Sequence, residues 1–244
     1  MGKLLAVLYG VVSYAFFFAV FLYAIAFVED LPVPKTIDSG TAGPLVPTLV
    51  IDALLLGVFA IQHSVMARPA FKAWWTRIVP AQVERSTYVL FASLALALVC
   101  WQWRPLPRNI WTIEGPLATA LLAVSYLGWL TVLTSTFLIN HFDLFGLRQV
   151  FAYASGREIP PSEFRTPLFY RVVRHPLYLG FIMAICVAPV MSLGHLVFAI
   201  GTTAYILIAI QFEEHDLVAS FGDTYRVYQK RVSMILPWIP SSKG

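Results

Sequence analysis

Charged residues are scarce in this chain, and that scarcity excludes an ordinary soluble domain. Of the 244 residues, 12% are charged and 59% are hydrophobic, whereas roughly a quarter of the residues in a soluble domain are charged. Several uncharged runs reach the roughly 20 apolar residues that a helix needs to cross a bilayer core. We therefore expect an integral membrane protein surrounded by the lipid bilayer.

Cysteine is rare, and the glycine-rich loop of soluble dinucleotide folds is missing. Cys100 and Cys186 are the two cysteines, and both lie in apolar runs, so neither a structural disulfide nor a C-x-x-C pair is expected. No G-x-G-x-x-G motif stands between a strand and a helix. The net charge of +4 does not indicate nucleic-acid binding, because the basic residues gather in particular loops, as membrane topology requires.

Four apolar runs predict transmembrane helices, at residues 4–28, 45–67, 86–103 and 116–139. Residues 177–212 contain no Asp, Glu, Lys or Arg; as one straight helix they would be about 54 Å long, against a bilayer core of roughly 30 Å. Pro189 and Gly194 offer a place to turn. We expect a helical hairpin with two arms of about 16 residues each.

A last helix is predicted from apolar residues that recur every three or four positions: Leu217, Phe221, Tyr225, Tyr228 and Val232. Such a helix lies on an apolar surface, and Pro237, Trp238 and Pro240 would end it near the membrane interface.

The charge distribution predicts the orientation of these segments. With the N-terminus in the cytoplasm, fourteen of the seventeen Lys and Arg residues fall on the cytoplasmic side, which obeys the positive-inside rule. The predicted fold class is therefore an all-α integral membrane protein, a single domain over residues 1–244. It has four transmembrane helices, a C-terminal helical hairpin and a cytoplasmic amphipathic helix, with both termini cytoplasmic.

The polar clusters all fall on the predicted cytoplasmic side: NHFDLFGLRQ (140–149), RVVRHP (171–176) and EEHD (213–216). Ionisable residues at the membrane margin are costly, which makes them candidates for function. A hairpin brings Arg174 and His175 near Glu213 and Glu214, where a pocket can hold a charged cofactor.

Structural interpretations compete with these functional ones. Arg174 can serve topology alone, with Glu213 and Glu214 as its surface ion-pair partners. His63, like Asp52, can be a helix-to-helix hydrogen-bonding residue. A metal site is not expected, because four consecutive helical residues such as EEHD cannot all face one ion.

An ordered set of motifs carries a family resemblance. RHPLYLG, an apolar hairpin, EE, F-G-x-x-Y-x-x-Y and a terminal I-P resemble the C-terminal half of the isoprenylcysteine carboxyl methyltransferase and phospholipid methyltransferase superfamily. Upstream, QHSVMARP, ERSTYVL and NHFDLFGLRQ make the whole chain similar to the NnrU-like branch, and within it to the bacterial membrane methanethiol S-methyltransferases.

The resemblance implies S-adenosylmethionine as cofactor, held by residues 140–240. By similarity, one side of the cofactor is lined by residues at the start of the hairpin, namely His175, Pro176, Tyr178, Leu179 and Gly180. Glu214 or its neighbour Glu213 would bind from the other side, and Arg174 would hold the methionyl carboxylate or brace the glutamates.

The same resemblance implies a small volatile thiol as substrate, methanethiol, converted to dimethyl sulfide in the bacterial inner membrane. A thiol reacts as its thiolate, so a base is needed. His141 is the candidate base, oriented by Asp143, with His63 behind them. Two rival hypotheses are an NAD(P)H-dependent membrane reductase with a similar C-terminal region and a non-enzymatic NnrU-like accessory protein of nitrogen-oxide metabolism.

Overall fold

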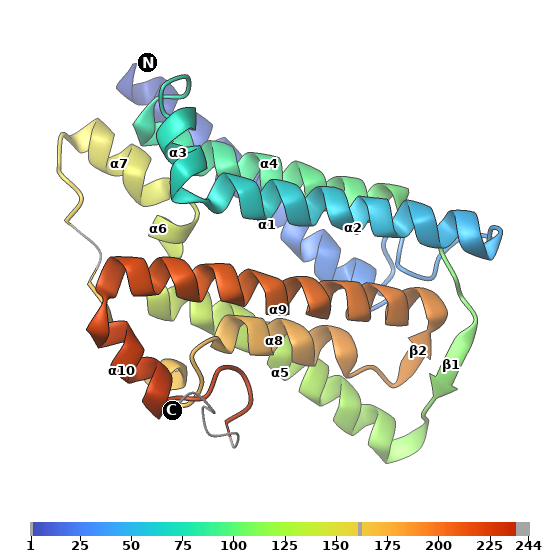
Figure 1. Cartoon of the computed structure of the whole chain (residues 1–244). Helices are drawn as coiled ribbons and strands as arrows, with labels where there is room; N and C mark the ends of the chain where they lie inside the picture. Colours follow the sequence, from blue (N-terminus) through green and yellow to red (C-terminus); the bar gives the residue numbers. More distant parts are fainter. Residues whose placement is uncertain (1, 161–162, 238–244) are drawn as a thin grey trace. The chain divides into compact units, whose positions relative to one another are not determined.

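A computed structural model describes residues 2–160 and 163–237, in which helices dominate and two short strands form one small sheet (Figure 1). Five of the described helices are long and apolar enough to cross a membrane: α1 (Lys3–Val28), α2 (Leu45–Ala67), α4 (Ala81–Gln102), α5 (Gly115–Ile139) and α9 (Leu193–Phe221). The prediction of a helical, multi-span membrane protein is therefore confirmed.

The chain forms two compact units, which we describe one at a time. The first contains α1, α2, α3 (Pro69–Trp75), α4, α6 (His141–Leu144) and α7 (Leu147–Ser155). The second contains β1 (Asn109–Thr112), α5, η1 (Leu168–Arg171), α8 (Pro176–Cys186), α10 (Asp223–Arg231), and most of β2 (Val190–Ser192) and α9.

In the first unit, α4 packs against both α1 and α2, and α7 packs against α1. Gly10 of α1 permits the close approach of α7, because a Cβ at this position would lie 2.7 Å from Cγ2 of Val150. Tyr9 of α1 donates a hydrogen bond to Oγ1 of Thr87 on α4, at 3.1 Å. Small residues and side-chain hydrogen bonds of this kind join helices inside membranes, where apolar side chains gain little from leaving lipid.

In the second unit, α5 and α8 are in backbone contact. A Cβ on Gly180 of α8 would lie 2.8 Å from the carbonyl oxygen of Gly128 on α5. Ser125 reinforces the contact by donating to the carbonyl of Ala184 at 2.8 Å. On another side of α8, Leu179 packs against Ile206 and Ile210 of α9.

The chain reverses direction between α8 and α9, but the two arms are unequal. α8 has 11 residues and α9 has 29, where two arms of about 16 were expected. β2 lies in the connection and pairs with β1, an element that sequence reasoning missed. α9 continues through the polar Glu213–Asp216 segment and ends at Phe221.

The predicted amphipathic helix is interrupted at Gly222. This glycine has φ +55°, a conformation that favours glycine because it has no Cβ, and α10 starts after it. Trp238 and Pro240, expected near the end of this helix, lie outside the described residues, as does the terminal I-P motif.

Candidate functional site

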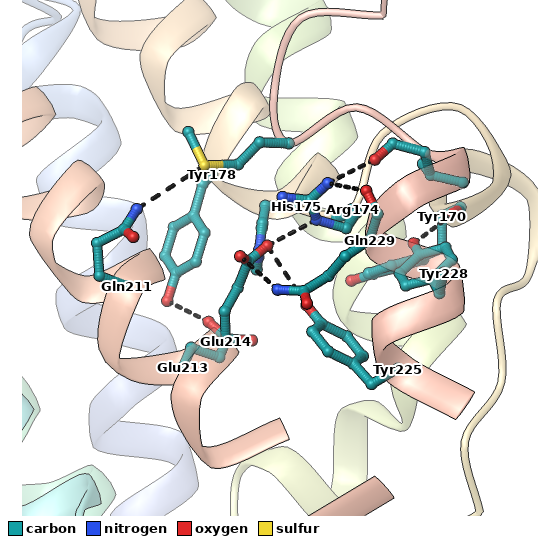
Figure 2. A network of polar contacts seen from close by, with 12 residues as sticks. Tyr170, Arg174, His175, Tyr178, Gln211, Glu213, Glu214, Tyr225, Tyr228 and Gln229 are labelled. Atoms are coloured by element: carbon teal, nitrogen blue, oxygen red, sulfur yellow. Dashed lines mark hydrogen bonds and ion pairs between the residues drawn. The ribbon is translucent and has the colours of Figure 1, made fainter. Parts of the chain in front are cut away.

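The second unit contains a buried ion pair between the start of α8 and the polar part of α9 (Figure 2). Nε of Arg174 donates to Oε1 of Glu214 at 2.6 Å, and the two side chains are 7% and 9% exposed. Nε2 of His175 lies 3.1 Å from the same oxygen. The structure thus brings together three of the residues named from the sequence.

Backbone pairing positions the RHP segment. The N–H groups of Arg174 and His175 donate to the carbonyls of Ser233 and Met234, at 2.8 and 3.1 Å. Pro176 then opens α8 at a position where its missing N–H leaves no helical hydrogen bond unmade. The segment is therefore held by the chain that follows α10, which aims both side chains at α9.

Arg174 also links α9 to the end of α10. Its Nη1 donates to the carbonyls of Gln229 and Val232, at 3.0 and 2.5 Å. Carbonyls at a helix C-terminus have no intrahelical partner and carry partial negative charge, so a guanidinium there satisfies them. Arg174 thereby braces three elements of the chain.

Glu214 receives further hydrogen bonds from α10. Gln229 Nε2 donates to Oε2 at 2.9 Å, and the Tyr225 hydroxyl lies 3.5 Å from Oε1. A buried charge is tolerated when it is paired and hydrogen-bonded, and Glu214 meets both conditions. Its contacts are those of a carboxylate that organises the surrounding side chains.

The neighbouring Glu213 differs in environment because adjacent helical residues point about 100° apart. It is half-buried, and its Oε2 accepts a hydrogen bond from the Tyr178 hydroxyl at 2.8 Å. Within the described part of the chain, its Oε1 has no partner. Glu213 therefore retains an oxygen that can accept hydrogen bonds from a ligand.

The remaining residues expected around the cofactor pack within the protein. Leu179 contacts the Ile206, Ile210 and Ile235 cluster, and Pro176 is fully buried. Gly180 faces α5, and the close contact between the two helices is enough to explain why this position is a glycine.

Tyrosines of α10 surround the ion pair, and they were not named as site residues from the sequence. Tyr225 is 1% exposed, and its ring packs edge-on against Phe164. Burial raises the pKa of Tyr228 to about 12 and places the pKa of Tyr225 still higher, helped by the nearby Glu214. Both hydroxyls therefore stay protonated. The F-G-x-x-Y-x-x-Y spacing was the available signal, because it places both tyrosines in one motif.

His141, the predicted base, lies in the first unit against α1. Its Nε2 is 2.8 Å from the hydroxyl of Tyr14, and its ring centroid is 4.8 Å from that of Phe145. Burial lowers the pKa of His141 below its ordinary value, so the imidazole is neutral at pH 7. No sequence motif indicated that Tyr14 would contact His141, because Tyr14 lies in the middle of an apolar helix.

Asp143 is held by α7. Its Oδ1 accepts a hydrogen bond from Gln149 at 2.8 Å, and its Oδ2 lies 3.4 Å from Nη1 of Arg148. The orienting role expected for Asp143 at His141 stays a prediction.

His63 occupies the end of α2 and belongs to the same apolar region of the first unit as His141. The Tyr88 hydroxyl lies 3.0 Å from its Nε2, and the ring of Phe59 stacks on it at 5.3 Å. Tyr88 shares a buried cluster with Met66, and Phe145 packs against that cluster. Both histidines therefore border one apolar, aromatic region.

Among residues 2–160 and 163–237, no group of three or more His, Cys, Asp or Glu side chains is placed to hold a metal ion.

Comparison with known proteins identifies the family. The chain is 57% identical, over 97% of its length and 83% of the relative's, to methanethiol S-methyltransferase 1 of Bradyrhizobium diazoefficiens. It is 55% identical to the methanethiol S-methyltransferase of Mycobacterium tuberculosis over 98% of both chains. The chain belongs to the methanethiol S-methyltransferase family. It is therefore a methyltransferase, as the motifs predicted.

A more distant relative of this methanethiol S-methyltransferase family member is nurim of Bos taurus, 32% identical over 71% of this chain and 69% of its own length. No protein-family model matches the chain. No solved structure matches it either.

A methyltransferase of this family needs a methyl donor, and the second unit offers polar groups that suit the donor expected from the sequence. Glu213 has an oxygen for hydroxyl groups, such as those of a ribose. Arg174 uses Nε and Nη1 in the contacts given above. Its Nη2 makes no hydrogen bond to another described residue, and its two N–H groups suit a carboxylate. Tyr178 adds an aromatic face and the His175 imidazole a second ring beside it, which suit a cationic or planar ligand.

Proposed function

We propose that this protein transfers a methyl group from S-adenosylmethionine to the sulfur of methanethiol and releases dimethyl sulfide. The proposal is supported above all by the 55–57% identity, over nearly the whole chain, to proteins named for methanethiol S-methylation. The polar network of Arg174, His175 and Glu214 supports it independently, because a membrane enzyme with a charged cofactor needs a paired, buried polar site.

Within the second unit, we assign direct cofactor contacts to the side chains with spare capacity. Glu213 is the proposed ligand of the ribose hydroxyls, and Arg174 of the methionyl carboxylate. His175 and Tyr178 line the same region, as the family resemblance implies. Pro176, Leu179 and Gly180 support it from behind through their packing inside the second unit. Glu214 is assigned a bracing role, because its oxygens already contact four side chains.

S-Adenosylmethionine supplies an electrophilic methyl group on a sulfonium. The neutral imidazole of His141 would accept the proton of the thiol, and the thiolate would then take the methyl group, leaving S-adenosylhomocysteine. Tyr14, 2.8 Å from His141 Nε2, holds the ring in place during the transfer. Asp143 and His63 are the proposed supporting residues, and the aromatic walls around them exclude water from the thiolate.

We further propose the membrane arrangement that the charge count favours. α1, α2, α4 and α5 cross the bacterial inner membrane, α8 and α9 form the returning pair, and both termini are cytoplasmic. Fourteen of seventeen Lys and Arg residues then lie on the cytoplasmic side. Residues 140–240 belong to the cofactor region of a single membrane domain.

Calorimetric titration of the purified protein separates this proposal from the reductase. S-Adenosylhomocysteine, the product form of the donor, should bind to the wild type, and NADPH should not compete with it. Binding of NADPH without S-adenosylhomocysteine would contradict the proposal, whereas cofactor binding without turnover would favour the accessory protein.

A further inference from the structure

The first unit has a cavity at the end of α2 that lies far from the histidines. It has a volume of about 580 Å³, within the range of small-molecule sites. Thr48 lines it, and His63 is fifteen residues further along α2, roughly 22 Å along the helix axis. With the proposed membrane arrangement, the cavity would lie at the opposite membrane interface from the proposed thiol chemistry.

Two cations and no carboxylate are among the described residues that line this cavity. Lys35 and Arg104 are the cations. The ammonium of Lys35 donates to the carbonyl of Trp101 at 2.6 Å, and its two other N–H groups have no partner in the described chain. The guanidinium of Arg104 likewise has no hydrogen-bond or ion-pair partner among residues 2–160 and 163–237. Burial, and then the repulsion from Arg104, lower the pKa of Lys35, and the nearby Asp52 opposes this in part. Asp52 does not line the cavity; it accepts a hydrogen bond from the backbone N–H of Arg104 at 2.8 Å and is one carboxylate beside two cations.

An apolar groove begins where the cavity ends. It has a volume of about 300 Å³ and runs between α1 and α4, lined by Val20, Tyr23, Ala97, Cys100 and Trp101. Pro34 and Lys35 line both spaces.

Tyr23 fixes the backbone of Lys35 at this junction. Its hydroxyl donates to the Lys35 carbonyl at 2.9 Å and accepts from the Lys35 N–H at 3.1 Å. The ammonium is thereby positioned where a polar headgroup would meet an acyl chain.

We propose that the cavity and the groove together bind one anionic phospholipid. Its phosphate lies between Lys35 and Arg104, and one acyl chain follows the groove between α1 and α4. Basic pockets at membrane interfaces recognise lipid headgroups in this way. Trp101 is 68% exposed at the end of α4, and tryptophan prefers the headgroup depth at which the phosphate would lie. The proposal is independent of the methyl-transfer reaction.

Native mass spectrometry of the full-length protein in detergent tests the headgroup. Phosphatidylglycerol should be retained about tenfold better than phosphatidylcholine of the same chains, since the ion pairs involve charged donors. Arg104→Gln should lose most of this preference, and Arg108→Gln, an exposed cation of the same loop that does not line the cavity, should keep it. Equal retention of the two lipids, or equal losses in the two variants, would overturn the proposal.

A second variant tests the acyl chain and distinguishes a lipid from free phosphate. Ala97→Leu narrows the groove and leaves both cations in place, so it should weaken retention of long-chain phosphatidylglycerol and spare the dihexanoyl form. An unchanged affinity for the long-chain lipid would overturn the groove assignment, as would its complete displacement by inorganic phosphate. The unfolding temperatures of the variants check that the fold is intact. Arg104→Gln should leave the fold unchanged, because the guanidinium makes no hydrogen bond or ion pair to another residue of 2–160 or 163–237.

Discussion

Replacing Glu214 with Gln removes one negative charge from the centre of the buried network and keeps the shape of the side chain. The side chains of Arg174 and His175 would remain buried, at 7% and 3% exposure, without a carboxylate partner. Removing one partner of a buried ion pair costs about 3–5 kcal/mol of unfolding free energy. For a chain of this length, each kcal/mol lowers the unfolding temperature by about 2–4 °C, so we expect a decrease of roughly 10 °C.

Glu213→Gln is the matched control, because it makes the same chemical change at the next residue. Glu213 is half-buried and accepts one hydrogen bond, from Tyr178, so its replacement should cost about 1 kcal/mol or less. The affinity of the Glu213→Gln protein for S-adenosylhomocysteine should nevertheless fall about tenfold or more, because a charged acceptor for the ribose hydroxyls is lost.

Thermal unfolding in detergent and calorimetric titration with S-adenosylhomocysteine measure the two effects separately. A normal unfolding temperature for Glu214→Gln, combined with a loss of affinity, would refute the reasoning and make Glu214 the direct ligand. An equal loss of stability in both variants would refute the distinction between a bracing and a binding carboxylate.

Two further perturbations test other parts of the structure. His141→Ala should slow turnover and retain cofactor affinity. Because burial lowers the pKa of His141, the wild-type rate should fall with acidification only below about pH 6.5. A fall in rate centred above that pH would exclude His141 as the base. Gly180→Ala would place a Cβ 2.8 Å from the carbonyl oxygen of Gly128 and should cost about 1–3 kcal/mol, whereas Gly57→Ala on α2, with no atom within 4 Å, should leave the unfolding temperature unchanged or slightly higher.

Helices long and apolar enough to cross a membrane were predictable, because the sequence signal for them is local. The expected helix at residues 45–67 coincides with α2. The helix expected at 116–139 matches α5, except that α5 begins one residue earlier, at Gly115. α4 begins at Ala81, five residues before the expected start. Glu84 and Arg85 lie in the first turns of α4, whereas hydropathy alone assigns them to a loop.

Features that depend on tertiary contacts were less accessible. The closeness of Arg174 to Glu214 followed from one chain reversal, so it was predictable. The pairing of His141 with Tyr14 joins residues 127 positions apart, and no spacing rule connects them. The helix break at Gly222 depends on a positive φ at this residue. A single glycine in an amphipathic pattern is not enough to predict such a break.

The most direct measurement of the proposed reaction uses purified protein, methanethiol and S-adenosylmethionine with a deuterated methyl group, with headspace gas chromatography and mass spectrometry as the readout. Dimethyl sulfide carrying one deuterated methyl should accumulate with the wild type and much more slowly with His141→Ala. Unlabelled dimethyl sulfide, or none from protein that binds S-adenosylhomocysteine, would contradict methyl transfer to methanethiol.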